Sequence, residues 1–211
     1  REIIIAVKDS GPDPSTNSKL RAIIQNAKAA NMPKDNIERA IKKAFEKSTE
    51  NFKEILLEGY APHGIAILVE AATDNNNRTV ANIRSYFNKC DGNLATSGSV
   101  DFLFNHLCFF QIKDEGLDIE ELELDLIDFG VTDLSKSESE ISITAKFENF
   151  GSLQKELERR NFDITSSEFE REAITLKDLG EDEIIKVEKL INMIDEDDDV
   201  QNVYHNMKSY D

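Results

Sequence analysis

The stretch Ile55-Leu56-Leu57-Glu58-Gly59-Tyr60, followed by Ala61-Pro62-His63-Gly64 and Ile65-Ala66-Ile67-Leu68-Val69, decides the fold class. Two apolar segments of strand length flank a turn, and the second is almost continuously apolar, as in a buried strand. A helix face follows, formed by Val80, Ile83, Phe87 and Cys90. Residues 102–112 return to a strand-like pattern, so this region predicts a β–α–β arrangement. Between helix and strand, residues 94–100 are small and polar and predict a mobile loop.

Toward the N-terminus the apolar spacing is helical. Residues 17–30 and 33–44 each carry an apolar stripe at intervals of three and four, and Asn31 is a plausible left-handed stop between them. Proline is common at the first position of a helix, because the N–H that it lacks would have no partner within the helix, so Pro33 fits such a position. Residues 1–10 fit a strand or a helix, because so short an apolar run has no clear period. The polar residues 48–54 predict a boundary.

Toward the C-terminus the pattern is again mixed. Residues 119–129 predict a helix that Gly130 ends, residues 141–147 alternate as a strand, and Leu153 and Leu157 belong to a helix that Ser152 could cap. Residues 162–166 alternate again and could pair with residues 173–176. A strongly amphipathic helix over 184–194 and a closing strand over 200–207 complete the chain.

Short helices that alternate with strands favour an α+β class with helices on one face of each sheet. The sequence contains no GxGxxG and no GxxxxGK[ST], so nothing supports a Rossmann or P-loop nucleotide site.

No apolar run approaches the roughly 20 residues that span a bilayer, and no signal peptide is visible. Two cysteines without CxxC spacing indicate a reducing compartment, and we expect a cytoplasmic protein without membrane contact.

The charge is distributed unevenly. The net charge is −17, yet residues 1–53 hold 11 Lys and Arg against 7 Asp and Glu, and the remainder holds 14 against 35. A basic segment attached to an acidic body can dock on a phosphate backbone, although Lys-rich helices also occur for solubility alone. The candidate contact residues on the opening helices are Lys19, Arg21, Lys28, Lys34, Arg39, Lys42 and Lys43.

Two further cations flank a helix start after the buried strand, where backbone N–H groups favour anions. They are Arg78 and Arg84, and each is about equally suited to an ion pair with one of the many nearby carboxylates.

The sequence does not predict an enzyme, a cofactor or a metal site. His63, His106 and His205 are isolated, and neither HExxH nor GxSxG occurs. The run Asp195-Glu196-Asp197-Asp198-Asp199 lacks EF-hand spacing, and a solvated acidic loop is the favoured interpretation.

Several ordered motifs resemble the YebC/PmpR family over essentially the whole chain. They are Gly11-Pro12-Asp13-Pro14 through Lys28, Asn31 to Ile41, Glu58 to Gly64, Thr73-Asp74-Asn75-Asn76-Asn77-Arg78-Thr79, Gly98-Ser99-Val100, and Asp198 to Tyr204. The resemblance implies a helical bundle (1–53), a central α+β sandwich domain (54–113 plus 180–211) and a third, acidic α+β sandwich domain inserted into it (114–179). Family members usually begin with a Lys- and Arg-rich segment that this sequence lacks.

The resemblance also implies a function. The family is described as DNA-binding transcriptional regulators, and its mitochondrial relatives activate translation of a cytochrome oxidase subunit. We therefore expect a nucleic-acid-binding regulator of gene expression with DNA as its partner. The alternative is a translation factor that binds ribosomal RNA on the ribosome and turns its acidic body toward basic ribosomal proteins.

Overall fold

The computed structural model describes residues 2–46 and 52–209, which form two compact units. Unit 1 combines Arg1–Thr49 with His106–Glu170, and unit 2 combines Glu50–Asn105 with Arg171–Asp211. The described residues contain two four-stranded sheets. The strand pairs whose residue register is known are antiparallel. The predicted α+β class is confirmed.

Unit 1 opens with three helices, α1 (Glu2–Ser10), α2 (Ser18–Ala29) and α3 (Lys34–Glu46). They enclose a small core built on Ala6, Val7, Leu20 and Ala44. Residues 2–10 are therefore helical, which settles the choice left open by the sequence. Asn17 caps α2: its Oδ1 accepts the Leu20 N–H at 3.0 Å, and its Nδ2 donates to the Ala6 carbonyl at 2.6 Å. Asn31 adopts φ 60°, which confirms the predicted left-handed stop.

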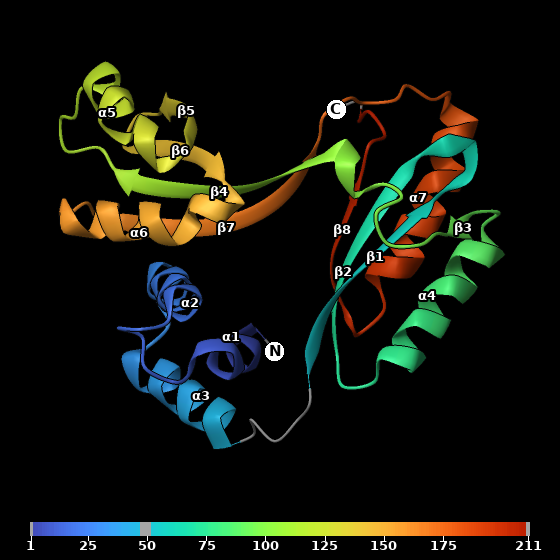
Figure 1. The fold of residues 1–211 in the computed structure, drawn as a ribbon, viewed down its shortest axis with the longest axis horizontal. Helices are drawn as coiled ribbons and strands as arrows, with labels where there is room; N and C mark the ends of the chain where they lie inside the picture. Colours follow the sequence, from blue (N-terminus) through green and yellow to red (C-terminus); the bar gives the residue numbers. More distant parts are fainter. Residues whose placement is uncertain (1, 47–51, 210–211) are drawn as a thin grey trace. The chain divides into compact units, whose positions relative to one another are not determined.

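The sheet of unit 2 has the order β3-β1-β2-β8. Its strands are β1 (Lys53–Tyr60), β2 (Ala66–Thr73), β3 (Asn93–Leu94) and β8 (Val200–His205), and the 3₁₀ turn Pro62–Gly64 joins β1 to β2. Helices α4 (Asn76–Lys89) and α7 (Glu181–Asp195) pack together on one face, where Ile83, Phe87 and Leu190 are buried (Figure 1). The opposite face of β2 is also covered, since Ala66 and Leu68 pack with Val100 and Phe104. Burial on both faces explains why residues 65–69 are continuously apolar.

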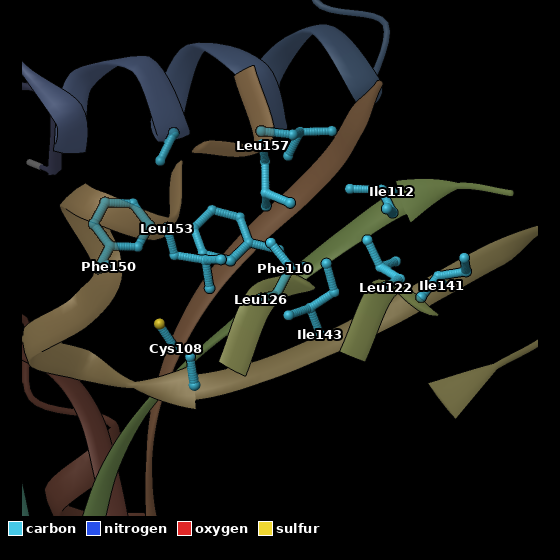
Figure 2. Close-up of a cluster of buried hydrophobic side chains, with 13 residues drawn as sticks. Cys108, Phe110, Ile112, Leu122, Leu126, Ile141, Ile143, Phe150, Leu153 and Leu157 are labelled. Atoms are coloured by element: carbon cyan, nitrogen blue, oxygen red, sulfur yellow. The ribbon is translucent and has the colours of Figure 1, made fainter. Parts of the chain in front are cut away.

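The second sheet has the order β5-β6-β4-β7. Its strands are β4 (Phe104–Lys113), β5 (Val131–Lys136), β6 (Glu140–Lys146) and β7 (Ile164–Ala173), which fall between β3 and β8 along the chain. Helices α5 (Ile119–Leu126) and α6 (Phe150–Arg159) cover one face. Figure 2 shows the resulting core, in which Phe110 of β4 stacks on Phe150 of α6 with ring centroids 5.2 Å apart.

Three local predictions are wrong, and one strand was not predicted. The β–α–β arrangement fails because β2 and β4 belong to different sheets. Strand β5 was missed, because its short segment contains only Val131 and Leu134 as apolar residues. Residues 173–176 do not pair with residues 162–166, because β7 runs through Ala173 as one strand. Ser152 does not cap α6, because Asn149 is the residue at the N-cap position. The Ser152 hydroxyl instead donates to the Asn149 carbonyl at 3.0 Å.

Candidate nucleic-acid interface

The outer face of α3 carries the densest group of exposed cations on the opening helices. Ile37 and Ala44 of α3 are buried, so Arg39, Lys42 and Lys43 fall on the side of the helix that faces solvent. Lys42 and Lys43 form no ion pair with any residue that the structure describes. Lys28 lies in the last turn of α2, is exposed, and likewise has no carboxylate partner among residues 2–46 and 52–209.

Three other cations of these helices have nearby acceptors. Lys19 Nζ lies 3.3 Å from Asp9 Oδ2, and Lys34 Nζ lies 3.6 Å from Glu38 Oε1, both at exposed positions. Arg39 donates to the Asp35 carbonyl at 3.2 Å and to Asn36 Oδ1 at 2.9 Å, within its own helix. Exposed pairs of this kind contribute little and exchange readily, so these side chains are still available to a phosphate.

Arg21 is committed to internal contacts. Its guanidinium donates to Glu158 Oε1 at 3.2 Å, to Gln154 Oε1 at 3.0 Å, and to the carbonyls of Pro14 and Ser15 at 2.9 and 3.1 Å. Only 16% of its side chain is exposed. Arg21 thus fastens α2 to α6 inside unit 1, and it has little capacity left for an external anion.

We expect Arg21→Ala to lower the free energy of unfolding of unit 1 by about 1–2 kcal/mol, because Gln154 and Glu158 lose a shared donor in a mostly buried contact. Lys28→Ala on the same helix serves as the control and should change stability by less than about 0.5 kcal/mol. Urea denaturation followed by circular dichroism measures both values. Equal stabilities of the two variants would contradict the structural role of Arg21.

Asn26 joins α2 to β7 within unit 1 and was missed by sequence reasoning. Its side-chain amide donates to the Ser167 carbonyl at 2.8 Å and accepts the Ser167 N–H at 2.8 Å. Ser167 lies on β7, the edge strand of the second sheet, so this side chain satisfies backbone groups that a neighbouring strand would otherwise pair. No local signal identifies such a residue, since its partner is 141 positions away.

Arg78 lies at the start of α4 and is held by two carboxylates. Its Nη2 is 2.9 Å from Asp74 Oδ1 and 3.1 Å from Asp199 Oδ2, and hydrogen bonding, first to Asp199 and then to Asp74, raises the pKa of Arg78. Asp199 Oδ2 also accepts the Thr79 hydroxyl at 2.8 Å. The Arg78 side chain is paired with these carboxylates, but 48% of it is still exposed to solvent.

Asp197 and Asp199 depart from the expected solvated acidic loop over residues 195–199, whereas Asp195, Glu196 and Asp198 are exposed. Only 6% of Asp199 is exposed, and Asp197 accepts the Tyr86 hydroxyl at 2.8 Å. That hydrogen bond, with some help from burial, raises the pKa of Tyr86 to about 12. These carboxylates therefore fasten β8 to the start and middle of α4.

Arg84 lies apart from these contacts on the exposed side of α4. With Ala81, Ser85, Asn88 and Lys89 it lines a shallow, open hollow. All five residues belong to one helix, so the hollow is a helix surface with two cations and not an enclosed ligand pocket. Arg84 forms no ion pair with the residues that the structure describes.

The three histidines have separate local roles. His63 Nδ1 lies 3.3 Å from Glu183 Oε1, and His106 stacks on Phe147 with ring centroids 3.7 Å apart. Burial lowers the pKa of His205, whose Nδ1 accepts the Met207 N–H at 3.1 Å.

Over residues 2–46 and 52–209, no group of three or more His, Cys, Asp or Glu side chains is placed to hold a metal ion. Among the helices of the described chain, none is both long and apolar enough to cross a membrane.

Comparison with protein families covers nearly the whole chain. A model described as the TACO1/YebC protein N-terminal domain matches residues 1–47, and one described as the TACO1/YebC second and third domain matches residues 52–207. The chain belongs to the TACO1/YebC family. The resemblance seen in the sequence motifs is thereby confirmed.

Relatives of this TACO1/YebC chain match it over nearly its whole sequence. A protein of Flavobacterium johnsoniae is 64% identical over 208 residues, which cover 99% of this chain and 88% of that protein. A protein of Parabacteroides distasonis is 52% identical over 212 residues, covering 100% of this chain and 87% of the relative. Both are named "Probable transcriptional regulatory protein". The crystal structure of a conserved hypothetical protein from Aquifex aeolicus has a TM-score of 0.75 and 38% identity, covering 98% and 86% of the two chains.

The TACO1/YebC motif around Gly98-Ser99-Val100 is anchored in the structure, which corrects the prediction of a mobile loop. The buried carboxylate of Glu58 accepts the N–H of Gly98 at 2.6 Å, of Val100 at 2.9 Å and of Asp101 at 2.7 Å. Burial would raise the pKa of Glu58, but these backbone hydrogen bonds outweigh burial and hold the pKa below its ordinary value of 4.5. Glu58 therefore fixes the position of a loop that looks flexible in the sequence.

Proposed function

We propose that this chain is a nucleic-acid-binding regulator of gene expression and that it acts as a DNA-binding transcriptional regulator. One observation carries the proposal: Lys28, Lys42 and Lys43 are exposed on the opening helices and have no carboxylate partner among the described residues. The names of the close relatives support the same role.

The basic side chains act by electrostatics. Lysines on a helix surface neutralise phosphates and release counterions, which gives affinity that falls steeply with salt but carries no sequence information. Lys42 and Lys43 of α3 and Lys28 of α2 are the exposed lysines without a carboxylate partner in the described residues, and Lys19, Lys34 and Arg39 add cations whose exposed partners a phosphate can displace. Arg78 and Arg84 lie in unit 2 and would require a second contact with the same polyanion.

A translation factor on the ribosome is the second candidate, and the acidic remainder of the chain favours it. Residues 106–170 hold 6 Lys and Arg against 17 Asp and Glu. Such a surface is repelled by a long DNA duplex, whereas a ribosome offers RNA phosphates beside basic proteins. Phosphate contacts by lysine do not distinguish DNA from RNA, so the two candidates share the basic face of α3 and differ in their partner.

Charge reversal tests the shared step. We expect Lys42→Glu/Lys43→Glu to weaken binding to duplex DNA or structured RNA by about tenfold or more and to reduce the salt slope by about 2, one for each lost phosphate contact. The matched control is Lys186→Glu/Lys189→Glu on α7, which reverses two exposed lysines in unit 2. Fluorescence anisotropy across a salt series measures both variants.

The partner is identified by parallel measurements on the unaltered chain. Duplex binding without ribosome co-sedimentation supports the transcriptional role, and co-sedimentation without duplex affinity supports the translational one. Unchanged affinity in the Lys42/Lys43 variant would remove α3 from both proposals.

A further inference from the structure

Helix α5 has two opposite apolar faces, only one of which is used by the fold. Leu122 and Leu126 are 4% and 0% exposed and pack into the core of the second sheet (Figure 2). Leu124 lies between them in sequence, and because successive residues turn by about 100° in a helix, it points to the other side. Leu124 is 73% exposed and Ile127, three residues further, is 60% exposed. Residues three apart are neighbours on a helix surface, so the two side chains form one small apolar patch.

Carboxylates surround this patch. Glu120 and Glu121 precede Leu124 by four and three residues, and Asp128 follows it by four, so all three lie beside it on the helix surface. These side chains are exposed and form no ion pair with the residues that the structure describes. Asp125 differs, since Arg160 Nη1 lies 2.7 Å from its Oδ2. The outer face of α5 is therefore an apolar centre with an anionic rim.

Glu120 and Glu121 lie in the first turn of α5, where the helix dipole favours negative charge, but the acidic side chains at its other end do not stabilise the helix. The last turn of α5 contains no basic residue, and Asp128 places negative charge near the C-terminal end, where the helix dipole disfavours it, whereas Arg160 already neutralises Asp125. Like charges three and four residues apart add further repulsion. An external cationic partner would relieve both effects, and two leucine-sized side chains exposed above half of their area would gain by burial against it.

We propose that the outer face of α5, centred on Leu124 and Ile127, is a docking surface for a Lys- and Arg-rich polypeptide segment that carries an apolar side chain. The anionic rim excludes nucleic acid and anionic lipid and is complementary to a basic polypeptide. This surface is separate from the basic face of α3, so the inference goes beyond the proposed function and does not depend on it. An eight-residue helix is about 12 Å long, so the contact is small and the complex is a transient one.

The test uses the full chain, labelled with ¹⁵N, and two synthetic peptides. One peptide is lysine-rich with two leucines spaced three residues apart, and the other has both leucines replaced by serine. We expect the leucine peptide to shift the amide resonances of residues 118–129 and to bind about tenfold or more tightly than the serine peptide, because its leucines lose water-exposed apolar area on binding and serine does not.

Matched variants complete the test. Leu124→Ser/Ile127→Ser should weaken binding of the leucine peptide by about tenfold while leaving the thermal midpoint unchanged, since both side chains are exposed. Ile185→Ser is the control, because Ile185 is 63% exposed on α7 of the other unit. Equal binding of both peptides, unchanged affinity in the double variant, or resonance shifts only outside residues 118–129 would overturn the proposal. Sedimentation that shows self-association of the unaltered chain, lost in the double variant, would also overturn it and identify a second copy as the occupant.

Discussion

Asp199→Ala is expected to lower the free energy of unfolding of unit 2 by about 3 kcal/mol, the largest effect of any single substitution considered for this chain. Asp199 is buried, and its Oδ2 accepts hydrogen bonds from Thr79 at 2.8 Å and from Arg78 at 3.1 Å. Removing the carboxylate leaves a cation and a hydroxyl without their buried acceptor. Arg78 retains Asp74 and Thr79 retains Thr73, so the loss falls at the lower end of what breaking a buried ion pair costs.

Urea denaturation monitored by circular dichroism measures the loss, and hydrogen exchange locates it. Because Asp199 fastens β8 to the start of α4, amides in the first turns of α4 should lose protection most. Asp195→Ala is the matched control, since Asp195 is an exposed carboxylate at the last residue of α7 and its removal should be neutral or slightly stabilising. A similar destabilisation in both variants would show that Asp199 acts only through net charge.

The fold was predictable where one physical signal dominates. The continuous apolar run over residues 65–69 indicated a strand buried on both faces, and β2 is such a strand. Helix α5 was predicted from Ile119, Leu122 and Leu126 at helical spacing, despite a leucine at every second position from Leu122 to Leu126 that imitates a strand. Strand β5 was missed, because a half-exposed edge strand of six residues with two apolar side chains has no strong period.

The sequence identifies the candidate cations by residue type, but it does not show which residues pair with them. Arg21 and Lys28 look equivalent in the sequence, as two cations on one helix. The structure distinguishes them, because Glu158 and Gln154 meet Arg21 across more than 130 positions of sequence, while Lys28 meets no carboxylate in the described residues. Long-range pairing of this kind depends on tertiary packing, which a single sequence does not reveal. The same reason hid the role of Glu58, which the sequence shows only as a charged residue inside an apolar strand.

Glu58→Gln is expected to lower the free energy of unfolding of unit 2 by about 2 kcal/mol at neutral pH. The carboxylate accepts two N–H groups at Oε1, from Val100 and Asp101, and one at Oε2, from Gly98. Glutamine retains one oxygen but places an NH₂ group opposite a third N–H, so two donors face each other in a buried site. Residues 97–101 should then lose hydrogen-exchange protection, which reports release of the loop directly.

The effect of Glu58 should depend on pH in a defined direction. Its folded-state pKa lies below the ordinary value of 4.5, so its contribution is fully present above about pH 4.5 and is lost as the pH falls through the folded-state value. The stability difference between the unaltered chain and Glu58→Gln should therefore be constant near neutrality and shrink in acid, because a protonated glutamate resembles glutamine. Glu172→Gln, at an exposed position of β7, is the control and should leave the stability curve unchanged. A difference that persists undiminished down to the acid limit of folding would mean that the charge of Glu58 is not what holds the loop.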